Sequence, residues 1–491
     1  MTKTDVTESP PPEGGAPPTE LKRAIGPKLL LLFIIGDILG TGVYALTGNV
    51  AKQVGGALWV PFLLAFVSAF LTAFSYLELV GKYPRAAGAA LYTHKAWGVH
   101  FFTFMVAFTV MSSGMSSASS AARAVGSSYI PKLFEFGDHF PDLYNADGTP
   151  SEALIIPIAI AFLLIFAALN LRGVSESVKA NVAFTIIEMT GLAIVVVIAL
   201  IGIFEGKGDA GRLSEFNTAD APVFLAVIGA TSLAFFAMVG FEDSVNMAEE
   251  TTNPRIFPRA MLTGMCIAAG IYLTVAILSS TLLSPADLSK GEAGALQNVV
   301  SYAVPGFPLW IFLAISIFAV SNSALINMMM ASRLVYGMSR QHVIPAVLGK
   351  VAPTRRTPWT AIIFTSLVAM ALTSYSNTQT LGATTSLLLL AVFTVVNVAV
   401  LVLRKDPVEH RHFKTPTPLP VLGALISLIL IVPWTSIYNG AWQPAERDKF
   451  ALAGYLLAVG LVLWLVTFIG QRVTGRRAER GEVPVDEDPH P

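Results

Sequence analysis

Long apolar windows recur along this chain, and they constrain its fold more than any other feature. Each window is close to the roughly 20 residues that cross the hydrocarbon core of a bilayer as an α-helix. With 54% of the 491 residues hydrophobic and 13% charged, too few polar side chains remain to cover a soluble domain of this length. The sequence therefore predicts an all-α membrane protein with twelve transmembrane helices, at 28–51, 57–80, 97–122, 152–171, 181–204, 221–246, 259–283, 309–332, 359–375, 381–403, 418–438 and 450–470.

Positive charges are distributed unequally between the two sides of these helices. When the loops are sorted by side, 24 of the 32 Lys and Arg residues fall on the side that holds both termini. Because Lys and Arg are concentrated in cytoplasmic loops, we expect a multi-pass protein of the plasma (cell) membrane with both termini in the cytoplasm. The polar ends, 1–24 and 471–491, are predicted to be disordered cytoplasmic tails that flank a transporter-like helical domain at 25–470.

Glycine residues mark two of the windows as unusual helices. The first window contains Gly40-Thr41-Gly42 near its middle, and the sixth contains Gly240 followed by acidic residues. Glycine allows a membrane helix to unwind, and the freed backbone groups must then face a cavity or a ligand. Paired interruptions in corresponding helices are typical of transporters built from inverted repeats. The alternative is that these glycines only allow helices to pack closely; for the pair, the sequence favours broken helices.

Several stretches resemble the signatures of one known family. They occur in the expected order on the first, second, sixth and eighth predicted helices, and together they are far more specific than any one alone. The stretches are residues 36–44 (GDILGTGVY), 75–78 (SYLE), 83–88 (YPRAAG), 235–242 (FFAMVGFE), 248–255 (AEETTNPR) and 332–340 (SRLVYGMSR). On these residues the chain is identified as a member of the amino acid–polyamine–organocation (APC) superfamily, and it resembles the amino acid permeases.

The resemblance implies a fold and an activity. It implies two five-helix inverted repeats, helices 1–5 (about 25–205) and helices 6–10 (about 220–405), with broken helices 1 and 6. Two peripheral helices at about 417–470 complete the expected domain. Family members are secondary active transporters that alternate between outward-open and inward-open states around a site near the middle of the membrane.

The expected substrate site lies at the two breaks. A substrate carboxylate suits the free N–H groups at the half-helix N-terminus formed by Gly40, Thr41 and Gly42. By resemblance to the family, the substrate ammonium would bind carbonyl groups freed near the breaks, and one aromatic ring would cover the bound substrate. The residues that these expectations assign are Ile38, Phe236, Val239 and Gly240, with Phe236 as the aromatic gate.

Acidic side chains inside membrane helices are costly, so each is a candidate functional group. Glu188 lies in the fifth window, where the resembled family often carries a lysine beside helix 1. Because burial favours a protonated carboxyl, we expect Glu188 to carry the coupling proton; the alternative is a structural carboxyl bonded to another helix. Asp37 either attracts a cation or ties helix 1 to a neighbour, and the structural role is favoured. Glu242 and Asp243 are expected to face the cavity or bind backbone at the break.

Other function classes have less support in the sequence. The chain has no HExxH, GxSxG or phosphate-binding loop motif, which argues against a membrane enzyme or an ATP-driven pump. We expect no cofactor, metal ion or nucleic-acid partner, and no filter-like repeat favours a channel. Proton symport is favoured over substrate exchange. Neutral amino acids, cationic amino acids and polyamines all remain candidate substrates, and the sequence does not predict an oligomeric state.

Overall fold

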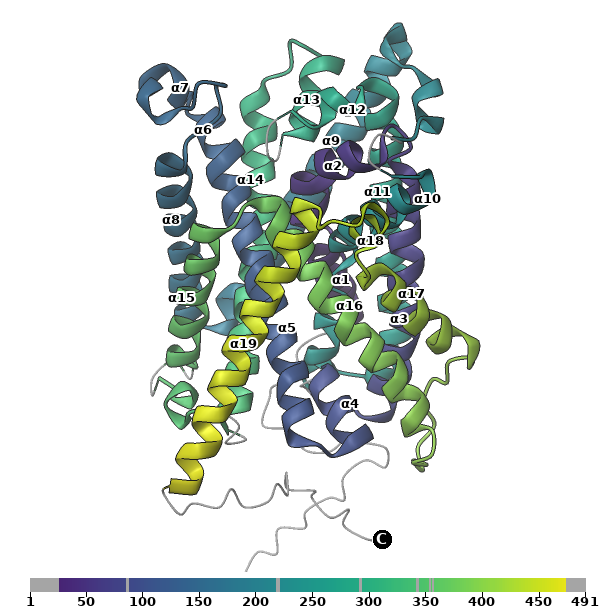
Figure 1. Cartoon of the computed structure of the whole chain (residues 1–491), viewed down its shortest axis with the longest axis vertical. Helices are drawn as coiled ribbons and strands as arrows, with labels where there is room; N and C mark the ends of the chain where they lie inside the picture. Colours follow the sequence, from purple (N-terminus) through teal and green to yellow (C-terminus); the bar gives the residue numbers. More distant parts are fainter. Residues whose placement is uncertain are drawn as a thin grey trace, which may run out of the picture.

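The computed structural model describes residues 26–84, 88–217, 221–290, 294–340, 344–352, 355 and 357–473. Within these residues the named elements are all helical, and Tyr144 and Pro150 form an isolated β-bridge. Figure 1 shows an elongated bundle with the short helices α12 (Pro285–Leu288) and α13 (Ala295–Ala303) at one end and α4 (Gly88–Trp97) at the other. The predicted tail at 1–24 lies outside the described residues, as does the chain beyond Val473.

Ten helical spans of the described chain are long and apolar enough to cross a membrane. Each of the twelve predicted windows lies on a helix, but two of these helices are shorter than a typical span. The shorter helices are α15 (Trp359–Tyr375), of 17 residues, and α17 (Pro418–Ile431), of 14 residues. The ten spans are Pro27–Val54, Trp59–Lys82, His100–Leu133, Glu152–Arg172, Lys179–Lys207, Val223–Asn246, Phe257–Leu282, Leu309–Arg340, Thr378–Leu403 and Pro444–Ile469.

The window predicted at 418–438 is not one continuous helix. Helix α17 ends at Ile431, Val432 is extended, and a separate short helix, α18 (Trp434–Asn439), follows. Pro433 explains the interruption, because proline lacks a backbone N–H group and disfavours a helical conformation in the residue before it. The predicted boundary is therefore wrong at this end.

The first span is interrupted where its glycines predict. Helix α1 (Pro27–Ile38) and helix α2 (Thr41–Val54) are separated by Leu39 and Gly40, and Gly40 has φ −119° and ψ −136°. The interruption leaves α2 with its own N-terminus inside the bundle. Its first N–H groups therefore have no partners within the helix.

The sixth span is also interrupted. Helix α10 (Val223–Ala234) tightens into the 3₁₀ turn η5 (Phe235–Met238), and Val239 is then extended, with φ −77° and ψ 147°. Gly240 follows at φ +125°, a conformation that only glycine adopts readily. The chain continues as the 3₁₀ helix η6 (Asp243–Glu250).

The two interruptions pack directly against each other. A Cβ atom added to Gly42 would lie 2.4 Å from Ala237 Cα, and one added to Gly240 would lie 2.7 Å from the Asp37 carbonyl. Real Cβ atoms do not approach other atoms so closely, so both positions require glycine. The glycines therefore serve both roles considered from the sequence, interrupting the helices and letting them approach.

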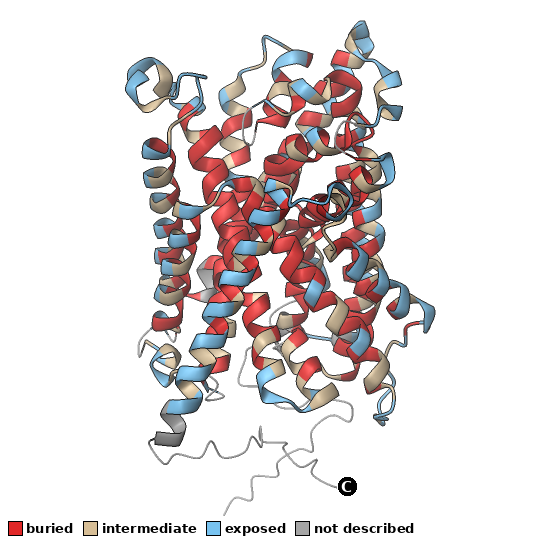
Figure 2. Ribbon diagram, in the orientation of Figure 1, coloured by how far each residue is buried: buried red, intermediate tan, exposed pale blue. Residues whose placement is uncertain are grey.

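The outer helices present apolar side chains away from the bundle. Figure 2 shows buried residues through the interior and exposed residues along the outer edges and both ends. In the most apolar window of the first span 83% of residues are buried, against 17% in α19 (Pro444–Val473). Cys266, the single cysteine of the chain, is exposed on α11 (Phe257–Leu282) instead of packing inside the bundle.

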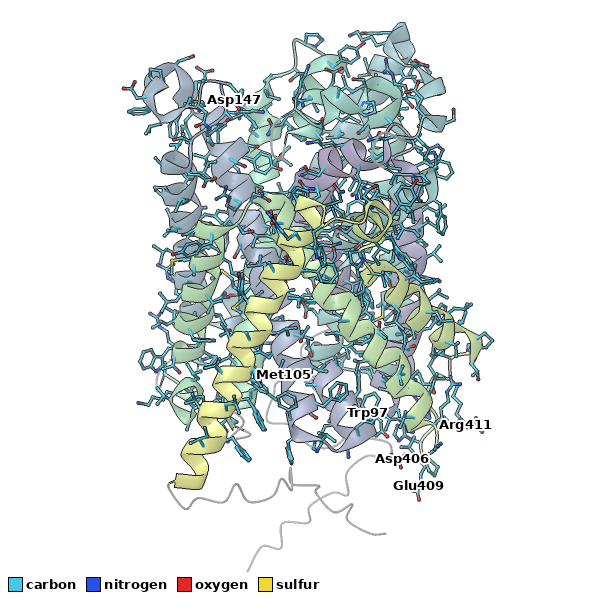
Figure 3. All side chains as sticks on the ribbon, in the orientation of Figure 1. Trp97, Met105, Asp147, Asp406, Glu409 and Arg411 are labelled. Atoms are coloured by element: carbon cyan, nitrogen blue, oxygen red, sulfur yellow. The ribbon has the colours of Figure 1, made fainter. Side chains whose placement is uncertain are left out.

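A buried ion pair joins the end of α3 (Trp59–Lys82) to the end of α16 (Thr378–Leu403). The Arg404 guanidinium donates to both carboxylate oxygens of Glu78, at 3.1 and 2.9 Å. The Thr415 backbone N–H donates to the same carboxylate at 2.8 Å. Figure 3 places Asp406, Glu409 and Arg411, in the loop that follows α16, at the same end of the bundle as Trp97 of α4.

Candidate substrate-binding site

A pocket lies where the two interrupted helices meet. It draws its lining from both breaks, from α5 (His100–Ala124) and from α14 (Leu309–Arg340). The lining residues are Asp37, Ile38, Thr41, Gly42, Ser117, Phe236, Val239, Gly240, Ser323 and Asn327. The structure thus brings together six of the seven residues predicted to bind substrate; Gly40, the seventh, packs against the Ser323 hydroxyl beside the pocket.

The N-terminus of α2 supplies hydrogen-bond donors on one side of this pocket. The Thr41 backbone N–H donates to the Ser323 hydroxyl oxygen at 3.2 Å. The Thr41 hydroxyl is buried and has no hydrogen-bond partner among the described residues. Free donors together with the positive end of a helix dipole favour an anionic group here.

The backbone carbonyls near the breaks are not equally free. The Ile38 carbonyl accepts a hydrogen bond from the Tyr272 hydroxyl of α11 at 2.6 Å. The Phe236 carbonyl accepts from the Val239 N–H over a longer 3.4 Å. One of the carbonyls predicted to bind an ammonium group is therefore already engaged by a tyrosine that the sequence did not single out.

Asp37 lies in the same pocket without a partner. Its side chain is 4% exposed, and neither carboxyl oxygen has a hydrogen-bond partner among the described residues. The tie to a neighbouring helix that the sequence favoured is not formed there. The role of this acid is taken up below.

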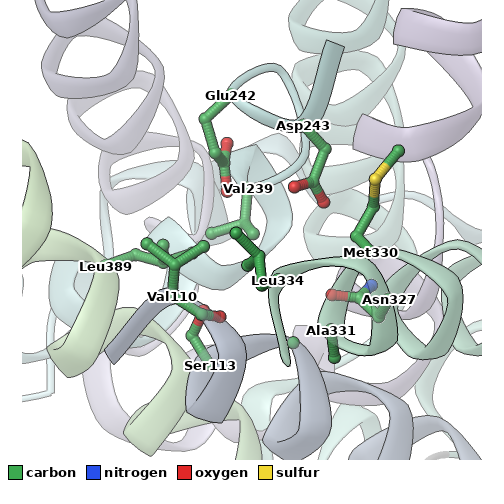
Figure 4. Close-up of a pocket in the computed structure, with 11 residues that line it drawn as sticks. Val110, Ser113, Val239, Glu242, Asp243, Asn327, Met330, Ala331, Leu334 and Leu389 are labelled. Atoms are coloured by element: carbon green, nitrogen blue, oxygen red, sulfur yellow. The ribbon is translucent and has the colours of Figure 1, made fainter. Parts of the chain in front are cut away.

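A second pocket adjoins the first and contains the other two acids at the sixth-helix break. Glu242, Asp243, Ser113 and Leu334 are among its lining residues, and Val239 and Asn327 line both pockets. Figure 4 shows the carboxyl groups of Glu242 and Asp243 near Val239, opposite Leu334 and Asn327. Its residues on α5 and α14 lie about a turn nearer to the bundle end that holds α4.

These two acids have partners. One Glu242 oxygen accepts from the Gly240 backbone N–H at 2.9 Å, which binds the carboxylate to the break itself. One Asp243 oxygen accepts from the Asn246 side-chain amide at 3.4 Å. The sequence suggested that these acids either face the cavity or bind backbone at the break. Both Glu242 and Asp243 line a cavity, and Glu242 also binds backbone at the break.

Glu188 lies on α9 (Val174–Gly202) and lines neither pocket. It is fully buried, and neither carboxyl oxygen has a hydrogen-bond partner among the described residues. Asn322 neighbours it, but the Asn322 amide donates to the Gly36 carbonyl at 2.9 Å and to the Thr185 hydroxyl at 3.1 Å. Glu188 therefore lies outside both pockets, beside the Asn322 amide that donates a hydrogen bond to Gly36 of α1.

A family model described as amino acid permease matches residues 25–464, most of the chain and both interrupted helices. The chain belongs to the amino acid permease family. The resemblance to the amino acid–polyamine–organocation superfamily is confirmed, and the permease is a multi-pass membrane transporter.

Relatives of the permease carry different names. It is 30% identical to the methylthioribose transporter of Bacillus subtilis, over 83% of the chain and 87% of that protein. It is 27% identical to the branched-chain amino acid permease BcaP of the same species, over 91% of the chain and 93% of that protein. It is 26% identical to cationic amino acid transporter 4 of Mus musculus, over 80% of the chain and 62% of that protein. Substrate class must therefore be argued from the pocket of this permease.

Two residues that bond to the first-helix break were not identified from the sequence. Ser323 bonds the N-terminus of α2, and Tyr272 bonds the Ile38 carbonyl. Ser323 lies on α14 among several other small polar residues, and nothing in the sequence distinguishes it from them. Tyr272 is one of the chain's 12 tyrosines, in an ordinary apolar window. No cluster of three or more His, Cys, Asp or Glu residues in the described chain is placed to hold a metal ion.

Proposed function

We propose that this permease is a secondary active transporter that moves amino acids or related organic cations by alternating access, coupled to proton symport. The observation that carries the proposal is the pocket at the crossing of two interrupted helices. It offers the Thr41 hydroxyl, which has no partner among the described residues, at the positive end of α2, and a carboxyl acceptor at the end of α1. Such a pair of sites is complementary to the carboxylate and the ammonium of an amino acid.

The pocket's surroundings support alternating access. The second pocket continues from the first toward the end that holds α4, which the charge distribution predicts to be cytoplasmic. A central site that extends toward one side of the membrane is what a rocking transporter needs as it exchanges access between the two sides. The proposed arrangement comprises two five-helix inverted repeats with two peripheral helices, in the cell membrane, with both termini in the cytoplasm.

Glu188 is the proposed proton carrier. Burial favours its neutral form, and no described residue donates to its carboxyl group to hold the charged form. A change in its protonation would act on Asn322, which bonds the Gly36 carbonyl of α1. The proton would thereby influence the helix that ends at the pocket. Substrate exchange without a proton remains the second candidate, because the pocket alone suits either mode.

The deciding experiment is uptake by the purified permease in proteoliposomes. The labelled probes are leucine, lysine and putrescine, each with and without an inward proton gradient. Gradient-driven, saturable accumulation of one probe supports symport and identifies the substrate class. Uptake only after the same probe is loaded inside would establish exchange instead. Absence of uptake for all three probes would overturn amino acid or polyamine transport.

The substitution Glu188→Gln tests the coupling residue in the same assay. We expect gradient-driven accumulation to fall to the level seen without a gradient, while exchange of internal for external substrate continues, because glutamine keeps the shape but cannot release a proton. Glu205→Gln provides a matched control, since Glu205 is 53% exposed near the far end of the same helical span. A Glu188→Gln permease that still accumulates substrate in response to the gradient would remove Glu188 from the proposal.

A further inference from the structure

We propose that Asp37 binds the protonated amine of the substrate, so that the permease selects for amines and against compounds without one. This inference rests on the proposed transport function and specifies the substrate chemistry of its site. It also replaces the backbone carbonyl of Ile38 with a side chain as the main acceptor for the ammonium group.

Asp37 lies where the two interrupted helices meet. Asp37 is the last residue but one of α1, and its carboxyl group lies between the two breaks. A Cβ atom built on Gly240 would lie 3.0 Å from Asp37 Cγ, so the sixth-helix break passes directly beside the carboxyl group. A substrate that contacts both interrupted helices must therefore pass next to this acid.

The missing hydrogen bonds carry the second part. Three acids line the two pockets, and Glu242 and Asp243 each have a hydrogen-bond donor. Asp37 alone among them has both oxygens buried with no partner in the described chain. A buried carboxyl group stays charged only beside a donor or a cation, so a cationic group that enters the pocket would supply the partner that Asp37 lacks.

The charges around Asp37 determine what kind of partner suits it. The ionisable groups that interact with it are Asp243, Glu242 and Glu188, all of which are acidic. An additional anion would be repelled from this side of the pocket, whereas a cation is attracted by several groups at once. An ammonium group also brings three N–H donors, and the two carboxyl oxygens of Asp37 can accept from them.

The Ile38 carbonyl is a weaker candidate than Asp37 for binding the ammonium group. The Ile38 carbonyl already accepts from the buried Tyr272 hydroxyl at 2.6 Å, which leaves it less capacity for a substrate. Asp37, its neighbour in the chain, offers two carboxyl oxygens without partners in the described chain to the same space. A site built around a buried acid rejects analogues that lack the matching donor, because they leave the acid unpaired.

The test uses leucine with two analogues that each lack one end of the molecule. 4-Methylpentanoate lacks the amine, and 3-methylbutan-1-amine lacks the carboxylate; 6-aminohexanoate and cadaverine serve in the same way if lysine is the transported probe. In the wild-type permease, the amine should inhibit uptake at least about tenfold more strongly than the acid. Stronger inhibition by the acid would overturn the proposal without any variant.

The variant Asp37→Asn tests the residue itself. We expect KM for the amino acid to rise at least about tenfold, and 4-methylpentanoate to inhibit the variant as well as or better than the wild type, since no charge is left unpaired. Loss of packing alone would weaken both analogues equally. Asp147→Asn, the same change in an exposed loop, is the control and should leave uptake unchanged.

These experiments distinguish a failure of the proposed amino acid transport from a failure of the role assigned to Asp37. If wild-type permease takes up neither leucine nor lysine, the proposed amino acid transport fails. If it does so and Asp37→Asn keeps its KM, or still rejects 4-methylpentanoate as strongly, the inference about Asp37 alone is overturned. If the variant is inactive, the ratio of amine to acid inhibition in the wild type decides.

Discussion

At the scale of single residues, the centre of the permease depends on contacts between two glycines and the opposite helix. Gly42 packs on Ala237, and Gly240 packs on Asp37, with Gly240 also held at φ +125°. These contacts bring the donor end of α2 and the acid of α1 into one pocket. Any side chain at either position must separate the helices that form the site.

Gly240→Ala should therefore impair both folding and transport. The added Cβ would meet the Asp37 backbone at 2.7 Å, and alanine is strained at this φ; such strain costs on the order of 1–3 kcal/mol even before the clash. We expect a lower melting temperature in detergent and at least a tenfold loss of uptake, on the order of the 1.4 kcal/mol that a factor of ten represents.

A matched glycine provides the control for this substitution. Gly270 lies on the exposed side of α11, and a Cβ atom there would have no neighbour within 4 Å. Because alanine favours the helix over glycine by about 0.5–1 kcal/mol, Gly270→Ala should leave uptake and melting temperature unchanged or slightly raised. Equal effects from the two substitutions would contradict the role assigned to Gly240.

Residue types indicated which positions to examine, but the sequence could not supply their partners. The glycine clusters predicted both breaks, and the pocket contains nearly all the residues assigned from the motifs. Asp37 was expected to tie helix 1 to a neighbour, and no such bond exists among the described residues. A sequence shows that an acid is buried, but whether a donor reaches it depends on the packing of several distant helices.

At the scale of helices, the ion pair between α3 and α16 joins segments that are far apart in the chain. Glu78 and Arg404 are separated by 326 residues, and the Glu78 side chain is 3% exposed while that of Arg404 is 27% exposed. The two hydrogen bonds between Glu78 and Arg404 give this acid a structural role. The identity of its partner was not predictable from spacing.

Arg404→Ala should destabilise the permease measurably. It would leave the buried Glu78 carboxylate with one donor, the Thr415 N–H. Removing one partner of a fully buried pair costs roughly 3–5 kcal/mol, and the partial exposure of Arg404 lowers this figure. Lys290→Ala breaks a surface pair with Asp287, in which the Lys290 and Asp287 side chains are 73% and 43% exposed, and should shift the melting temperature much less because solvent screens the pair. Melting curves of the two variants in detergent compare these costs; equal shifts would show that the inner pair adds nothing.

Helix boundaries show where pattern reasoning failed and why. Hydropathy placed every window on a helix, because burial in lipid requires long apolar segments with internally satisfied backbones. It overran the end of α17, where Pro433 stops the helix and α18 begins after a bend. Apolar composition alone does not distinguish one long helix from two shorter ones that meet at a proline.

At the scale of the whole molecule, the interior and the periphery differ in what they require of the sequence. The interrupted helices are almost fully surrounded by protein, whereas α19 is largely exposed along its length. Hydropathy was sufficient to predict a helical membrane protein, since it reflects the solvent around the chain. The relation of the two pockets and the position of Glu188 behind helix 1 depend on how helices from both halves of the chain pack together.

The exposed Cys266 has a practical consequence for spectroscopy. It is the only cysteine in the sequence, and α11, which carries it, packs against α1 and bonds the Ile38 carbonyl through Tyr272. Any thiol-reactive spin label or fluorophore that reacts with the natural sequence can attach only at this point, on a helix that contacts the broken first span. A second label on one cysteine introduced in α5 or α14 would allow the distance between that helix and α11 to be measured during the transport cycle.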